Sequence, residues 1–128
     1  MEEVKSLLNC DTYDFFKAFN AMRNDFDEFF KATKINDVVY KKYDIPEDAP
    51  AEEREKIFTE IGNDRFNKVV QACFGDNIDL TYNLLTKICF GDEEYIKKMS
   101  EIEIVGFVFK VFMNSRLLPF FAIYKPSE

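Results

Sequence analysis

The sequence predicts an all-α fold, in which residues 1–128 form a single small domain of about five to seven helices. The chain has 128 residues, which is the usual length of one domain. Apolar residues make up 47% of it and charged residues 32%, as is typical of a folded globular protein. Large apolar side chains recur at helical spacing along most of the chain, and residues that begin or end helices separate these stretches.

The first helical stretch carries aromatic side chains on one face. Because this face continues for four turns, we expect a helix near residues 12–32, either continuous or broken around Asn24. Asp11 is the expected N-cap, since its carboxylate can accept hydrogen bonds from the free N–H groups of the first turn. The residues of the face, at offsets of 0, 4, 7, 11 and 14, are Phe15, Phe19, Met22, Phe26 and Phe29.

A short helical piece is expected around Val38, and a linker follows it. Residues 44–50 contain two prolines and no apolar periodicity, so they are expected to join an N-terminal helical part to a C-terminal one. Pro50 suits the first position of the next helix, because its missing N–H has no partner there. That helix is expected to continue past Phe58, with Gly62 as a point where it can break.

A tetrapeptide occurs twice in the second half of the chain. Cys73-Phe74-Gly75-Asp76 returns sixteen residues later as Cys89-Phe90-Gly91-Asp92. Glycine can take the left-handed conformation that closes a helix, and aspartate can cap the next helix. Each copy therefore predicts the end of one helix and the start of another. The segment between the copies is expected to be helical, since its leucines share one face.

The residues after the second copy predict a short helix that ends near Met99 and a further helix that starts at Ser100. Ser100 and Glu103 have the spacing of a capping box. Residues 102–113 hold nine apolar residues in twelve, many of them β-branched or aromatic, so a buried strand is the alternative. The capping box and the helical surroundings favour a helix.

The composition argues against most classes of enzyme. The chain contains no histidine, which excludes histidine-dependent acid–base and nucleophilic catalysis and histidine-containing metal sites. Its three cysteines, Cys10, Cys73 and Cys89, show no CxxC spacing and are expected to be buried apolar side chains. We therefore expect a protein that is not an enzyme, with no catalytic residues, no cofactor and no metal.

The net charge of the chain is −7, and the first half carries all of it. Residues 1–64 have a net charge of −7, and residues 65–128 have a net charge of zero. An acidic surface repels phosphate groups, so we expect neither nucleic-acid nor membrane binding. The start, Met1-Glu2-Glu3, lacks the basic and apolar regions of a signal peptide, which predicts a cytoplasmic protein.

Phenylalanine is unusually frequent, with 15 residues in the chain. Most of these rings are expected in the core, but neighbours such as Phe29-Phe30 point to different faces of a helix. The residues leave open whether the pairs are core or interface. We predict that some of them are exposed for a partner or for self-association. The predicted partner-binding residues are Phe107, Phe109, Phe112, Leu117, Leu118, Phe120 and Phe121.

The order of these features resembles the tail assembly chaperones of long-tailed (siphovirus-type) phages and prophages of Gram-positive bacteria. The resemblance covers roughly residues 11–121. Its motifs are an aromatic helix with Asp14-Phe15-Phe16-Lys17, an acidic helix with Glu52-Glu53-Arg54-Glu55, a helix with Leu84-Leu85, the stretch Tyr95-Ile96-Lys97-Lys98-Met99-Ser100-Glu101-Ile102-Glu103, and the terminal Phe120-Phe121.

This resemblance implies a chaperone that binds the long, hydrophobic tape-measure protein, or other tail proteins, in the bacterial host cytoplasm during tail assembly. Apolar patches would cover the client, and the negative charge would keep the complex soluble. The alternative is a small acidic helical regulator or inhibitor that binds one folded protein. In that case the acidic residues between Asp44 and Glu60 would form one exposed face.

Overall fold

The computed structural model describes residues 4–124, and within this range the chain is helical without any strand. The expected all-α fold is confirmed. Three of the eight described helices are only four or five residues long, which is why their number exceeds the predicted range. The acidic start Met1-Glu2-Glu3 lies outside the described residues. The helices are α1 (Thr12–Ala21), α2 (Arg23–Thr33), α3 (Ile35–Val39), α4 (Ala51–Cys73), α5 (Ile78–Ile88), α6 (Glu93–Lys97), α7 (Glu101–Phe112) and α8 (Leu118–Phe121).

The aromatic stretch forms two helices, α1 and α2, and the break between them lies at Met22 rather than at Asn24. Asp11 caps α1 as expected, because its Oδ1 accepts a hydrogen bond of 2.8 Å from the N–H of Asp14. Met22 leaves the helical conformation, and its side chain is buried. The break thus lets the chain change direction while the same apolar face stays against the core.

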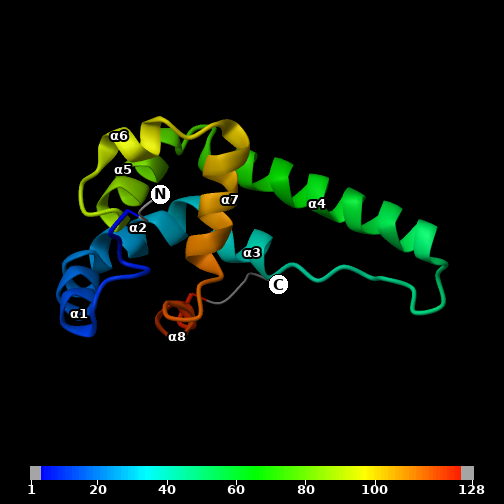
Figure 1. Ribbon diagram of the computed structural model, residues 1–128, viewed down its shortest axis with the longest axis horizontal. Coiled ribbons are helices and arrows are strands. Elements are labelled where there is room, and N and C mark those ends of the chain that lie inside the picture. Colours follow the sequence, from blue (N-terminus) through cyan, green and yellow to red (C-terminus); the bar gives the residue numbers. More distant parts are fainter. Residues whose placement is uncertain (1–3, 125–128) are drawn as a thin grey trace.

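The longest helix, α4, projects from the helical body, and the preceding segment runs outward alongside it to its tip (Figure 1). Its 23 residues correspond to a length of about 35 Å. Residues 41–50, here called the strap, contain no helix, as their prolines predict. Pro50 lies at the N-cap, one position earlier than expected. The helix continues through Gly62, although a glycine inside a helix costs about 1 kcal/mol relative to alanine.

The two copies of the repeated tetrapeptide both end a helix, but they do so in different ways. In the second copy Phe90 and Gly91 have φ values of 54° and 87°, and Asp92 caps α6. In the first copy neither residue has a positive φ, and Asn77, rather than Asp76, occupies the N-cap position of α5. The left-handed turn expected at both glycines is therefore present only at Gly91.

Residues 102–113, for which a buried strand was the alternative prediction, form most of the helix α7. Both hydrogen bonds of the capping box are present: Ser100 Oγ accepts from the N–H of Glu103, and Glu103 Oε1 accepts from the N–H of Ser100 at 2.9 Å. Local capping therefore outweighs the β-branched and aromatic composition. The helix is buried on one broad face, which includes Ile104, Val108 and Val111.

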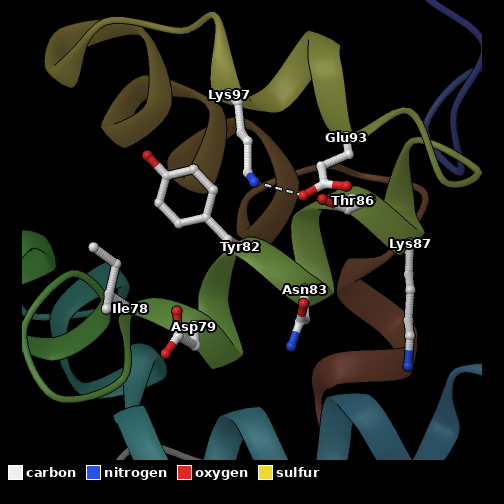
Figure 2. Close-up of a pocket in the computed structure, with 8 residues that line it drawn as sticks. All are labelled: Ile78, Asp79, Tyr82, Asn83, Thr86, Lys87, Glu93 and Lys97. Atoms are coloured by element: carbon white, nitrogen blue, oxygen red, sulfur yellow. Dashed lines mark ion pairs between the residues drawn. The ribbon is translucent and has the colours of Figure 1, made fainter.

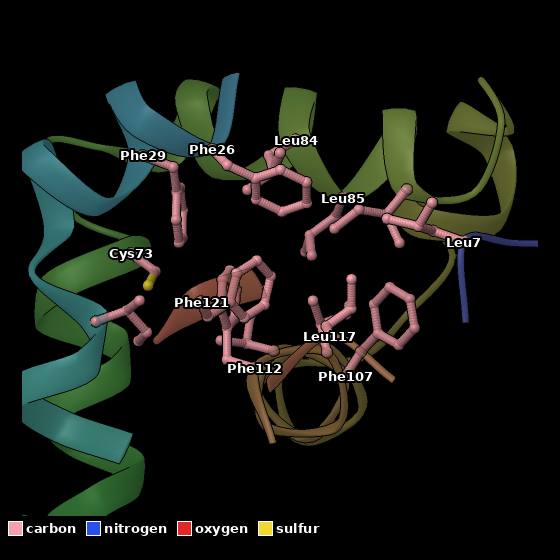
Figure 3. Packing of buried hydrophobic residues seen from close by; sticks show 14 of the residues in the cluster. Leu7, Phe26, Phe29, Cys73, Leu84, Leu85, Phe107, Phe112, Leu117 and Phe121 are labelled. Atoms are coloured by element: carbon pink, nitrogen blue, oxygen red, sulfur yellow. The ribbon is translucent and has the colours of Figure 1, made fainter. Parts of the chain in front are cut away.

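The core lies between α2, α5, α7 and the C-terminal segment (Figure 3). Phe29 of α2 stacks on Phe112 of α7 with 5.2 Å between ring centroids and 8° between their planes. Leu84 and Leu85 of α5 reach the same core from another side. Thr81 Oγ1, which is fully buried, donates a hydrogen bond of 2.6 Å to the carbonyl of Cys73 and so links α5 to the end of α4.

Candidate functional site

The predicted partner-binding residues do not form one exposed patch. Four of them, Phe107, Phe112, Leu117 and Phe121, are buried in the core, so the folded chain does not offer them to a partner. This corrects the expectation for these four. The other three are half-buried: Phe109, Leu118 and Phe120.

Phe121 and Phe112 are buried together because the C-terminal segment folds back over α2. The ring of Phe121 lies 5.1 Å from the rings of both Phe26 and Phe30 and 5.4 Å from that of Phe112. Its neighbour Phe120 lies at the edge of this cluster, 4.7 Å from the ring of Phe19. The aromatic surplus of the sequence therefore fills the core to a greater extent than predicted.

Large apolar side chains are exposed on several separate elements. Isolated exposed apolar residues are common on soluble proteins and carry no functional argument by themselves. The half of α4 that projects from the body differs from the other elements because its apolar residues lie among many acidic ones. The most exposed large apolar side chains are Tyr13, Phe16, Phe58, Ile102, Met113 and Ile123, each of which has about half or more of its surface accessible.

The outer part of this projection, residues 44–60, is here called the acidic arm. It contains seven acidic and two basic residues, so it carries five of the seven net negative charges. Its charged side chains are exposed. Phe58 is 55% exposed among them, and Ile57 and Ile61 are half-buried beside the strap. The acidic arm thus presents apolar side chains in a strongly negative setting.

The base of the arm is held by a polar network around Asp64. The Tyr43 hydroxyl donates a hydrogen bond of 2.6 Å to Asp64 Oδ2, and Lys68 Nζ lies 2.9 Å from the same oxygen. Lys41 Nζ lies 3.5 Å from it. The Tyr43 hydrogen bond, followed by the Lys68 ammonium, lowers the pKa of Asp64 from 3.8 to about 2. The network fixes the strap against α4.

This network predicts a pH dependence of stability. Because the pKa of Asp64 is lower in the folded chain, its contribution is present above pH 4 and is lost as the pH falls from about 4 to about 2. We expect Asp64→Asn to be less stable than the natural chain at pH 6, with a difference that shrinks towards pH 2. Urea unfolding across this pH range measures it. Glu60→Gln, which removes an exposed carboxylate of the same arm, is the matched control. An undiminished difference at low pH would contradict the assignment.

A hollow of about 670 Å³ lies on the outer face of α5, beside α6 (Figure 2). Both of its lysines are in ion pairs: Lys97 Nζ lies 2.6 Å from Glu93 Oε1, and Lys87 Nζ lies 2.8 Å from Asp25 Oδ1. The first ion pair lowers the pKa of Glu93 and raises that of Lys97. Acid–base catalysis needs the opposite, a pKa moved towards neutrality. The pKa shifts of Glu93 and Lys97 are therefore those of a structural ion pair.

The three cysteine thiols are free and buried, as the sequence predicts. Burial raises the pKa of Cys73 to about 12 and that of Cys89 to about 11, so neither is a thiolate near neutral pH. Within residues 4–124 no cluster of carboxylates and thiols has the arrangement of a metal site. None of the helices described in that range has the length and apolar character needed to cross a membrane.

Comparisons with family models, with curated proteins and with solved structures give no significant match to this chain. The acidity of residues 44–60 was visible in the sequence, but their projection from the body was not. The sequence feature that could have indicated this region is Gly62, because a glycine is unusual in the middle of a long helix.

Proposed function

We propose that this chain is a non-enzymatic assembly chaperone, of the tail assembly type that its sequence resembles, and that it binds a hydrophobic client protein through the acidic arm. The observation that carries the proposal is the exposure of Phe58 on an arm that holds most of the net negative charge. An apolar contact covers the client, and the surrounding carboxylates keep the complex soluble.

The resemblance to tail assembly chaperones supplies the client, the tape-measure protein. A long client of this kind offers many similar apolar segments. Each copy of the chaperone then needs only modest affinity, because several copies bound along one client protect it together. A narrow arm suits this role, since it reaches the client without bringing whole helical bodies into contact with one another.

The proposal predicts that co-expression of this chain keeps the tape-measure protein encoded by a neighbouring gene soluble. The two proteins are then expected to purify together. Phe58→Ser is expected to abolish the rescue, because it removes the exposed ring while leaving the core intact. Phe16→Ser is the matched control, since Phe16 is also about half exposed but lies on α1. A client that stays insoluble with the natural chain would refute the chaperone function.

The acidity of residues 44–60 also favours a second candidate, a regulator or inhibitor that binds one folded protein with a basic surface. Stoichiometry separates the two functions. A chaperone binds in several copies along an extended client, and a regulator forms a complex of fixed composition with a folded partner. Analytical ultracentrifugation of the purified complex measures this ratio.

A further inference from the structure

One face of α4 changes from buried to exposed along the helix. Near the C-terminal end, Val69 and Cys73 are fully buried in the core, and Phe66 packs partly buried against it. Phe58 and Gly62 precede Phe66 at intervals of four residues, so they continue the same helical face towards the tip. There Phe58 is 55% exposed. The face of α4 that packs against the core near Cys73 is thus exposed to solvent near Phe58.

No contact within the folded chain requires a glycine at position 62. It lies in the interior of α4, where alanine is more favourable, and its conformation is helical. A Cβ placed on it would meet no atom within 4 Å, so no neighbour requires its lack of a side chain. A glycine on an uncovered apolar face permits the close approach of another backbone. The backbone at Gly62 is therefore open to another molecule.

Two aromatic residues border this glycine. Phe58 lies one turn before it and Phe66 one turn after it on the same helical face. Gly62 thus leaves a position without a side chain between two aromatic residues on this face. The ridges of a crossing helix pack into grooves of this kind, and the absence of a side chain at the crossing point shortens the distance between the axes.

The charge of the arm selects the occupant. Residues 44–60 have a net charge of −5, so two arms of the same chain would repel each other. A helix that carries lysine or arginine around an apolar stripe would gain both the apolar contact and the electrostatic complementarity. We propose that Phe58, Gly62 and Phe66 form a docking notch for a basic amphipathic helix of the client, an inference that rests on the proposed function.

The test uses a labelled synthetic peptide of about five helical turns, with leucine and alanine on one face and lysine on the rest. We expect it to bind the full chain, with fluorescence anisotropy as the readout. Gly62→Leu is expected to weaken binding at least about tenfold, because the side chain fills the notch. The same variant is expected to keep or raise the thermal midpoint, since leucine is a better helix former than glycine.

Asn67→Leu is the matched control, because it adds the same side chain to α4 at an exposed position that lies neither three nor four residues from Phe58, Gly62 or Phe66. It is expected to bind the peptide as the natural chain does. Equal binding by Gly62→Leu, or equal binding of a peptide with glutamate in place of lysine, would overturn the inference. So would a dimer of the free chain that Gly62→Leu dissociates, since the notch would then hold a second copy.

The client experiment separates the failure of this inference from the failure of the proposed function. If the natural chain and Gly62→Leu rescue the tape-measure protein equally, the chaperone function stands and the notch is refuted. If neither rescues it, the proposed function fails, and the peptide titration still reports whether the notch binds a basic helix.

Discussion

A chain that ends at Ser115 is expected to lose its cooperative unfolding transition. Such a truncation removes Leu117 and Phe121, both buried in the core, together with the ring of Tyr124, which stacks on Phe30 at 4.1 Å. Each buried aromatic ring contributes about 3–5 kcal/mol, and the whole domain is stable by only about 5–15 kcal/mol. The remaining helices would then enclose an open apolar surface.

Three measurements describe the expected state of the truncated chain. Far-UV circular dichroism should show retained helix, near-UV circular dichroism should lose its aromatic signal, and a hydrophobic dye should bind. A chain that ends at Tyr124 is the control, because it keeps every contact named above. A sharp thermal transition in the chain that ends at Ser115 would show that the core closes without the C-terminal segment.

Phe121→Ala and Phe120→Ala are expected to differ strongly in stability, although the two residues are neighbours of the same type. Phe121 is only 1% exposed and contacts the rings of Phe26, Phe30 and Phe112, so its removal should cost about 3–5 kcal/mol. Phe120 is half-buried, and its removal should cost about 1–2 kcal/mol.

Chemical unfolding of the two variants measures this difference directly. The pair serves as its own matched control, because the deleted atoms are the same and the positions are adjacent. Equal losses would show that Phe121 does not have the deeper position assigned to it. If Phe120→Ala loses little stability, the same variant can also be used in binding experiments, because it stays folded.

The helices were predictable from the sequence where local chemistry determines them. Asp11 and the Ser100–Glu103 capping box begin α1 and α7 at the expected residues, because caps act within one turn. The break at Met22 was not predictable from local chemistry. It depends on how the aromatic face of α1 and α2 follows the core, which is a property of tertiary packing.

The repeated tetrapeptide shows the limit of local patterns most clearly. Cys73-Phe74-Gly75-Asp76 and Cys89-Phe90-Gly91-Asp92 have the same side chains, yet only the second takes a left-handed turn. The first is followed by Asn77, whose side-chain Nδ2 donates to the carbonyl of Ala72 at 3.0 Å and helps to close α4. The same four residues therefore end α4 and α5 with different backbone conformations.

The candidate site was only partly predictable, because burial depends on contacts between distant segments. The sequence placed Phe120 and Phe121 together on a binding surface, but α2 covers one of them and leaves the other at the edge. The acidity of residues 44–60 was evident from the sequence. Their separation from the body follows from the length of α4, which a break at Gly62 would have shortened.

The position of the acidic arm also makes the whole molecule an electric dipole. Five of the seven net negative charges lie on a projection at one end, and the rest of the chain is nearly neutral. In the field of a positively charged surface, such a molecule experiences a torque that turns the arm forward before any contact is made. Approach and orientation are then coupled, and most encounters with a basic surface begin at the arm.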